Sequence, residues 1–307
     1  MTEISSLHTE QRNIESSDID RMTSLEIAEL MNCCDRSIPY AVEKALPEIA
    51  EAITSAETVL RNGGRVIYIG AGTSGRLGVL DASECPPTFG VSPDSVVGII
   101  AGGQTALTEA VEGAEDDAGQ AEKDLKQHEL TEKDFVVGIS ASGRTPYVAG
   151  GLIYAKSLGC RTAAVSCVNG SNIGEIADIS IEADTGPEVI TGSTRLRAGT
   201  AQKMILNMIS TGSMVRIGKT YRNLMVDLVP KNEKLRLRCV KILCEAASLS
   251  VEQAEIRLKE AKGNLKAAIV MSMNNCSLEM AESLLRENDN KIAGSELQEK
   301  REENNET

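Results

Sequence analysis

The chain has 307 residues, a net charge of −13 and a pI near 4.8, and 2% of its residues are aromatic, with no tryptophan. Binding to DNA or RNA depends on phosphate neutralisation by Lys and Arg, so this acidic composition argues against a nucleic-acid partner. No stretch reaches the ~20 apolar residues of a membrane span, and the eight cysteines lack zinc-type spacing. We therefore expect a cytoplasmic protein with free thiols, no membrane partner and two structural units.

Helical spacing of apolar residues dominates the stretch 24–61. Thr23 and Glu26 are spaced as in a capping box, which predicts a helix start, and Gly63 and Gly64 are expected to end the last helix of the stretch. Residues 1–23 are polar without a clear period. They predict either an arm that orders on a partner or ligand, or a disordered segment.

Five short runs rich in Val and Ile follow, at 65–70, 95–101, 135–140, 161–167 and 178–183. Helical or small-residue segments separate the first four runs. Connections of this length predict a parallel sheet with right-handed crossovers and helices on both faces, an α/β fold. In such sheets, ligands bind beyond the carboxyl ends of the strands.

The remaining chain is expected to be helical, with segments at 193–218, 232–247, 251–260, 264–273 and 278–287. Arg195, Arg197 and Lys203 lie near the start of the first of these, either on a solvated face or in a site. We divide the chain into residues 1–225 and a small all-α domain at 226–307. The charged tail after Asn288 is expected to be disordered.

The stretch GAGTSGRLG at 70–78 directly follows the first apolar run. Glycines allow a tight turn and close approach of the backbone to a ligand, while Thr73, Ser74 and a following helix start offer hydrogen-bond donors to an anion. The natural ligand of such a loop is a phosphate. An ordinary strand-to-helix turn is the equally favoured alternative on this stretch alone.

Two further hydroxyl-rich stretches favour the binding interpretation. SASGRTP at 140–146 follows the third apolar run, and TGST at 191–194 precedes the long helix expected at 193–218. Gly70 and Ser140 both fall at the carboxyl ends of expected strands. Three such loops predict one shared pocket.

His8 lies in a polar arm and His128 at a charged helix end, so neither is expected to be catalytic. We therefore expect carboxylates to act as the acid and the base. Glu84 lies where Pro86 and Pro87 are expected to stop a helix and expose its carboxylate, although a solvated helix end also explains it. Glu115 falls on the apolar stripe of a helix expected at 104–127, which predicts burial and a raised pKa. Structural burial with a partner is the alternative.

Several motifs, in this order, resemble N-acetylmuramic acid 6-phosphate etherases, members of the sugar isomerase (SIS) domain superfamily. They are GAGTSGRLGVLDASECPPT at 70–88, IAGG at 100–103, AVEGAED at 110–116, SASGRTPY at 140–147, TGSTRLRAGTAQK at 191–203 and NLMVD at 223–227. The resemblance covers roughly residues 9–297. It implies a SIS domain with flanking helices followed by the small all-α domain.

The resemblance also implies an activity: cleavage of the lactyl ether of N-acetylmuramic acid 6-phosphate to N-acetylglucosamine 6-phosphate and D-lactate in cell-wall recycling. Water is the second substrate, no metal or redox cofactor is required, and the family forms homodimers. Glu84 matches the proton donor and Glu115 the base at C2. The expected contacts to phosphate and sugar are Thr73, Ser74, Gly75, Ser140, Ser142, Gly143, Thr145 and Ser193.

One residue departs from the family pattern, since Arg197 stands where the third block has a lysine. The charge is kept but the donor geometry is not. Two other functions remain open in the same superfamily. A glucokinase-type regulator carries two SIS domains, for which this chain lacks room, and an aldose–ketose isomerase needs no acid at C3.

Overall fold

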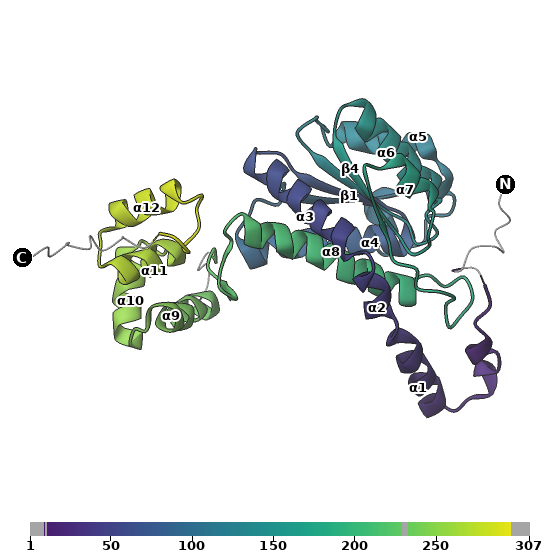
Figure 1. Ribbon diagram of the computed structural model, residues 1–307, viewed down its shortest axis with the longest axis horizontal. Helices are drawn as coiled ribbons and strands as arrows, with labels where there is room; N and C mark the ends of the chain where they lie inside the picture. The colour runs from purple at the N-terminus through teal and green to yellow at the C-terminus, as the bar shows by residue number, and fades with distance from the viewer. Residues whose placement is uncertain (1–8, 10, 229–232, 296–307) are drawn as a thin grey trace, which may run out of the picture. The chain divides into compact units, whose positions relative to one another are not determined.

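A computed structural model describes residue 9 and residues 11–228 and 233–295 (Figure 1). The chain divides into two compact units. The first unit comprises the described residues of Met1–Pro86 and Ser92–Ser213, and the second those of Pro87–Val91 and Met214–Thr307. The domain division expected between residues 225 and 226 stays a prediction.

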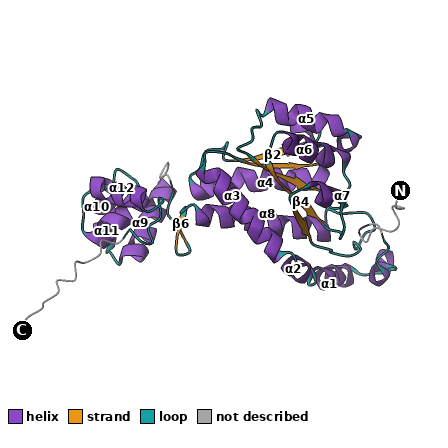
Figure 2. Cartoon of the chain, turned by 45° about the horizontal axis from the view of Figure 1, so that its top comes forward, coloured by secondary structure: helices purple, strands orange, loops and turns teal. Residues whose placement is uncertain are grey.

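The first unit contains the expected five-stranded parallel sheet, in the order β2-β1-β3-β4-β5 (Figure 2). Its strands are β1 (Val66–Gly70), β2 (Val96–Ile100), β3 (Phe135–Ile139), β4 (Arg161–Ser166) and β5 (Ile179–Glu182). All residues of β1 and β3 are buried, as befits central strands covered on both faces. This arrangement confirms the α/β fold expected from the alternation of apolar runs.

Helices cover both faces of this sheet. On one face, Tyr68 and Ile139 approach α4 (Gly72–Phe89) so closely at Gly78 that a Cβ there would lie 2.9 Å from the Cβ of Tyr68. On the other face, Gly138 gives room to α6 (Pro146–Ser157), which packs with α5 (Ala118–Gln127). The remaining elements are α7 (Asn172–Ile176), on that second face, and α8 (Arg197–Arg216).

The helical stretch before the sheet forms three helices, α1 (Ser24–Asp35), α2 (Ile38–Glu43) and α3 (Leu46–Arg61). The expected capping box is present, because Thr23 and Glu26 bond each other's backbone N–H groups. Gly63 ends α3 in the left-handed conformation, with φ of +76°. Residues 11–23 contain two short 3₁₀ turns, Ile14–Ser16 and Ile19–Arg21, while the expectation for 1–8 and 10 lies outside the described residues.

Two helix predictions near the expected site are wrong. The helix expected at 104–127 is replaced by 3₁₀ turns at Gly103–Leu107 and Ala114–Asp116, followed by α5. Left-handed Gly113 breaks the helical path, and the Asp117 side chain caps a new start at Ala118. Pro86 and Pro87 do not stop α4, which continues to Phe89; the N–H groups that they lack belong only to its final turn.

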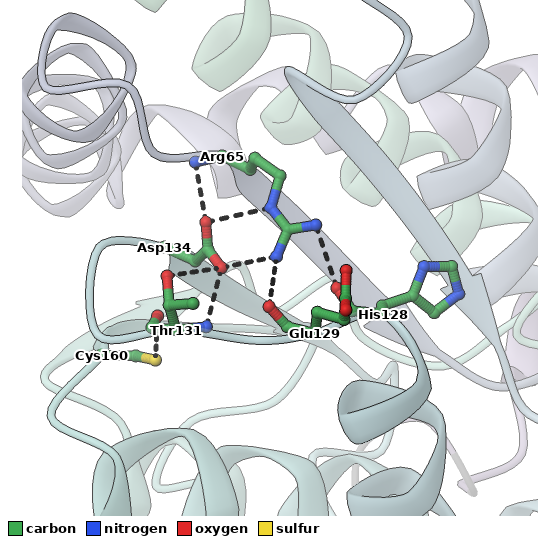
Figure 3. A network of polar contacts seen from close by, with 6 residues as sticks. All are labelled: Arg65, His128, Glu129, Thr131, Asp134 and Cys160. Carbon is green, nitrogen blue, oxygen red and sulfur yellow. Dashed lines mark hydrogen bonds and ion pairs between the residues drawn. The ribbon is translucent and has the colours of Figure 1, made fainter.

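The amino ends of β1 and β3 are joined by an ion pair between partly exposed Arg65 and buried Asp134 (Figure 3). Asp134 accepts hydrogen bonds from the backbone N–H, Nε and Nη2 of Arg65 at 3.0, 3.1 and 2.8 Å, and from the N–H of Thr131 at 3.0 Å. Arg65 also donates to the carbonyl oxygens of His128 and Glu129, each at 3.0 Å. These contacts hold the amino ends of β1 and β3 together. They lie at the edge of the sheet opposite the carboxyl ends of these strands.

The second unit contains a short hairpin that the sequence did not indicate, β6 (Thr220–Tyr221) and β7 (Leu224–Met225). Its four helices confirm the predicted segments: α9 (Glu233–Ala247), α10 (Val251–Glu260), α11 (Leu265–Asn274) and α12 (Leu278–Glu287). Side chains of Ser250, Asn264 and Ser277 cap the last three. The expectation of a disordered tail falls partly on 296–307, outside the described residues. Across the part of the chain that is described, no helix has the length and hydropathy to cross a membrane.

Candidate active site

Three segments start side by side at the carboxyl edge of the sheet. Gly70, the last residue of β1, pairs with Ile100 of β2 on one side and with Ile139 of β3 on the other. The first loop (71–75), the Glu115 segment (101–117) and the second loop (140–145) therefore leave neighbouring strand ends. Because the chain passes from β1 to β2 and later returns to the other side of β1, ligands are expected between the loops after β1 and β3.

The first loop is largely the first turn of α4, whose helical residues begin at Gly72. Glycine is required at position 75, since a Cβ there would lie 2.6 Å from the carbonyl oxygen of Gly70 and 2.7 Å from Ile100. The backbone thus turns tightly enough to aim the first N–H groups of an 18-residue helix at the sheet edge. Thr73 is half-buried here and Ser74 is buried.

The second loop brings its three predicted hydroxyls together. Ser140 Oγ lies 2.8 Å from Thr145 Oγ1 and 3.4 Å from Ser142 Oγ. Thr145 is the N-cap residue of α6, yet its side chain caps no backbone N–H of that helix. Gly143 has φ of +67°, and a Cβ there would lie 2.4 Å from that of Ser171, so only glycine fits. A cluster of hydroxyls at an uncapped helix start suits an anion.

Glu115 lines a hollow of about 140 Å³ together with Gly72 and Arg76 at the start of α4. The hollow thus joins the first loop to the Glu115 segment. Glu115 itself is exposed in the 3₁₀ turn Ala114–Asp116, so the predicted burial on an apolar helix stripe is wrong. The reason is that the helix on which that stripe was drawn begins only at Ala118.

Arg76 holds the Glu115 segment against α4, a role that the sequence analysis missed. Its Nε donates to the carbonyl oxygen of Leu107 at 3.1 Å and its Nη2 to that of Glu109 at 3.0 Å. The segment contains two glycines in the left-handed conformation, Gly102 and Gly113. The sequence offered a signal only in retrospect, since Arg76 is the one charged residue in the glycine-rich stretch 70–78.

Glu84 lies farther along α4 than the first loop. It is separated from Thr73 by about three helical turns, or about 16 Å along the axis, on the same face of the helix. Glu84 is exposed, as expected. The expected cause is wrong, because α4 does not break at the prolines. The structure therefore places Glu115, but not Glu84, on the hollow beside the first loop.

The third predicted cluster, 191–194, leads into the first turn of α8. Ser193 is half-buried, and a few residues later Gly199 lies against the first loop, where a Cβ would be 3.5 Å from Thr73 Cγ2. Arg197 is buried and donates to Ser37 and to the carbonyl oxygen of Pro187, each at 2.7 Å. The alternative of a solvated basic face therefore holds for exposed Arg195 and Lys203 and is wrong for Arg197.

Within the described residues, no histidine lies at this edge of the sheet. His128 follows α5 at the opposite edge, beside Arg65, and His8 lies outside the described residues (Figure 3). The described chain holds no cluster of three metal-ligating side chains. Burial raises the pKa of the Cys167 thiol, which directly follows β4 at this edge, and this disfavours its reactive thiolate form.

Two family models match the first unit. The model described as the glucokinase regulatory protein N-terminal SIS domain matches residues 48–156, and the SIS domain model matches residues 117–211. A solved phosphoheptose isomerase from Francisella tularensis is similar at 19% identity, covering 62% of this chain and 98% of its own, with a TM-score of 0.48.

Curated relatives match almost the whole chain. N-acetylmuramic acid 6-phosphate etherase of Oceanobacillus iheyensis is 56% identical over 90% of this chain and 94% of its own. The protein of that name from Halalkalibacterium halodurans is 53% identical over 92% of this chain and 95% of its own. The chain therefore belongs to the N-acetylmuramic acid 6-phosphate etherase family and contains a SIS domain.

Proposed function

We propose that the protein is a carbon–oxygen lyase that cleaves the lactyl ether of N-acetylmuramic acid 6-phosphate, giving N-acetylglucosamine 6-phosphate and D-lactate in cell-wall amino sugar recycling. The names of the relatives described above support this activity. The structural observation that carries it is the hollow shared by Glu115, Gly72 and Arg76. It puts a carboxylate next to a helix start suited to a phosphate.

The reaction begins with removal of the C2 proton of the open-chain sugar, which is acidic because C2 adjoins the C1 aldehyde. Glu115 is the proposed base. The lactyl oxygen then leaves C3 with a proton from Glu84, and water adds to the unsaturated sugar. Two carboxylates suffice for these proton transfers, and the steps require no metal or redox cofactor.

The proposed contacts to phosphate and sugar come from the loops at the carboxyl edge of the sheet. Their common feature is a hydroxyl or an accessible backbone N–H near a helix start. They are Thr73, Ser74 and Gly75 in the first loop, Ser140, Ser142, Gly143 and Thr145 in the second loop, and Ser193 before α8.

D-lactate release from N-acetylmuramic acid 6-phosphate by the purified protein tests this proposal. We expect Glu84→Gln and Glu115→Gln each to lower the rate at least about 100-fold, because a positioned acid or base contributes a factor of about 10² to 10⁴. Glu112→Gln is the matched control, since Glu112 lines the same hollow without an assigned role. Undiminished lactate release by both active-site variants would contradict the assignment.

The same assay separates the two other functions. The match of residues 48–156 to a glucokinase regulatory protein domain favours a sugar-phosphate-responsive regulator, which would bind the ligand without releasing lactate. An aldose–ketose isomerase would incorporate deuterium from D₂O at C2 without ether cleavage. Lactate formation together with C2 exchange distinguishes the etherase from both.

We propose further that two copies form a homodimer in the cytoplasm. Exposed apolar side chains support a partner surface: Leu25 on α1 is 67% exposed, Tyr40 on α2 68% and Leu80 on α4 52%. Free cysteines suit a reducing compartment. Light scattering on the purified protein should give twice the chain mass of 32.8 kDa, and a monomer at micromolar concentration contradicts the dimer.

We also propose that residues 226–307 form a separate C-terminal helical domain after an N-terminal helical segment and SIS domain at 1–225. A core cluster from Tyr221 to Ile292 supports a separately packed helical region, and Tyr221 joins it from the preceding hairpin. Limited proteolysis of the full chain should leave two stable fragments separated near residue 226. Cleavage that removes α9 to α12 stepwise contradicts an independently folded domain.

A further inference from the structure

The side chain of Gln202 is completely buried between α8 and α4, beside the first loop. Its exposed fraction is 0%, and that of Ser74 on α4 is 7%. Ser74 Oγ donates a hydrogen bond to Gln202 Oε1 over 3.0 Å. Gln202 Nε2 finds no hydrogen-bond partner in the described part of the chain. A buried amide with unused N–H donors is unusual and calls for a physical explanation.

This hydrogen bond uses the only proton of the Ser74 hydroxyl. A serine hydroxyl carries one donor and two acceptor lone pairs, so Ser74 Oγ presents only lone pairs to any ligand at the start of α4. A phosphate group also offers only acceptor oxygens at neutral pH. In this arrangement, Ser74 would repel a phosphate rather than hold it.

Half a turn of the Gln202 amide exchanges the positions of Oε1 and Nε2. Nε2 then donates to Ser74 Oγ, and the Ser74 proton is free to donate to a phosphate oxygen at the start of α4. The turned amide pairs one of its two N–H donors with Ser74 and leaves Oε1 where Nε2 had been. Each orientation makes one hydrogen bond to Ser74, so the added bond from the Ser74 proton to a phosphate oxygen is what favours the turned orientation.

We propose that Gln202 is a positioning residue that sets the direction of the Ser74 hydroxyl, so that phosphate binding at the first loop is coupled to a turn of the Gln202 amide. The inference rests on the proposed function, because it takes the ligand of the first loop to be the phosphate of a sugar. Gln202 touches Ser74 and acts on the ligand only through it. It therefore governs binding of the phosphorylated end rather than proton transfer.

The test is a double-mutant cycle on Gln202→Met and Ser74→Ala, read by calorimetric binding of N-acetylglucosamine 6-phosphate, the proposed product. Methionine keeps the volume of glutamine and removes the amide. We expect each single variant to bind this probe about tenfold more weakly, about 1.4 kcal/mol. The double variant should lose no more than Ser74→Ala alone, because Gln202 has no effect without the hydroxyl.

Two further readouts separate positioning from packing. In lactate release, Gln202→Met should raise KM about tenfold with kcat changed less than about threefold, and binding of unphosphorylated N-acetylglucosamine should not change. Ser210→Ala is the matched control, since Ser210 is a second buried serine between the same helices, bonded to Asp81 at 3.1 Å. It should lower thermal stability and leave the affinity for the sugar phosphate unchanged.

The outcomes distinguish this inference from the proposed function. If the wild-type protein releases lactate but Gln202→Met binds the sugar phosphate normally, or the two losses add, the coupling is overturned and the etherase function stands. If the wild-type protein releases no lactate but the losses of sugar-phosphate affinity in Gln202→Met and Ser74→Ala are not additive, the function is overturned and the coupling stands. Absence of sugar-phosphate binding by the wild-type protein overturns both.

Discussion

Arg76 of α4 donates from Nε to the carbonyl oxygen of Leu107 at 3.1 Å, which ties the segment carrying Glu115 to the helix that begins at the first loop. Arg76 Nη2 donates a second hydrogen bond, to the carbonyl oxygen of Glu109 at 3.0 Å, so two bonds hold the segment. Such an anchor matters if Glu115 is the proposed base, because a displacement of about one ångström costs a large factor in rate.

Arg76→Met should therefore lower kcat for lactate release by about 10- to 100-fold with a smaller change in KM. Steady-state kinetics measures the split, and millimolar guanidinium should restore part of kcat because it can occupy both carbonyl oxygens. Arg161→Met is the control, since Arg161 pairs with Glu51 on the surface at the opposite edge of the sheet. Unchanged kcat in Arg76→Met would show that the segment is held by other contacts.

Asp134→Asn should destabilise the first unit. Burial tends to raise the pKa of Asp134, but hydrogen bonds from Arg65 and Thr131 outweigh it and hold this pKa below its ordinary value. Removing the buried carboxylate leaves the charge of partly exposed Arg65 without its partner, which costs about 2 kcal/mol of unfolding free energy near pH 7. Urea denaturation measures this loss, with exposed Asp20→Asn as the control.

The loss should depend on pH. A lowered pKa in the folded protein stabilises the fold above the unfolded value of about 3.9, and this stabilisation disappears as the pH falls through the folded value. The unfolding free energies of wild-type protein and Asp134→Asn should therefore converge below about pH 4. A difference that persists unchanged to acid pH contradicts the role of the Asp134 charge.

Asp81 on α4 should show the opposite pH dependence. Burial raises its pKa, although Asn207 Nδ2 and Ser210 Oγ donate to its Oδ1 at 2.7 and 3.1 Å. The folded protein therefore binds the Asp81 proton more tightly than the unfolded chain does. This contribution to stability is complete below the unfolded pKa of about 3.9 and is lost as the pH rises through the raised folded value.

Asp81→Asn removes that titration and keeps an oxygen for both donors. We expect the variant to be at least as stable as wild type at pH 7, since it no longer has to bury an ionised carboxylate. Thermal unfolding between pH 4 and 7 should show a shallower fall of stability with rising pH than in the wild type. A loss above about 1 kcal/mol at pH 7 would mean that the charged form of Asp81 is stabilising.

Lys266 should make a large contribution to the stability of the second unit. It is buried on α11 and donates to Asp227 Oδ2 and to the carbonyl oxygen of Gly218, both at 2.8 Å, and to the carbonyl oxygen of Asn290 at 3.2 Å. Lys266→Met removes the donor to the carbonyl oxygens of Gly218 and Asn290, whereas Asp227 keeps its ion pair with Lys219 at 3.0 Å. We therefore expect a loss of about 2 kcal/mol. Hydrogen exchange should accelerate in α11 and α12 and stay unchanged in β3.

The control for this change is Lys241→Met, because Lys241 is exposed on α9. It should leave exchange in α11 and α12 as in the wild type. Faster exchange in both variants alike would indicate a general effect of charge removal, and not the loss of the Lys266 contacts.

The sequence predicted the elements whose determinants are local. Alternation of buried Val/Ile runs predicted the five strands, and helical periodicity predicted α9 to α12. Thr23 with Glu26 predicted a helix start correctly, because a capping box lies within one turn. The motif resemblance also pointed to the family that the curated relatives establish.

Other features depended on contacts between residues distant in the chain. The exposure of Glu115 could not be read from helical periodicity, because left-handed Gly113 and the Asp117 cap replace the helix on which that stripe was drawn. Two hydrogen bonds likewise join segments whose local sequence patterns are unrelated. Arg76 bonds the carbonyl oxygen of Leu107, and Ser74 bonds buried Gln202.

By itself, the sequence determined a parallel α/β fold, a helical C-terminal region and the glycine- and hydroxyl-rich loops, because backbone propensity and hydrophobic period act over a few residues. Only the tertiary structure decided which loops meet. The pairing of Gly70 with both Ile100 and Ile139 places β1 between β2 and β3 and sets the three segments side by side. Strand order is a property of long-range packing, and the position of Glu115 beside the first loop follows from it.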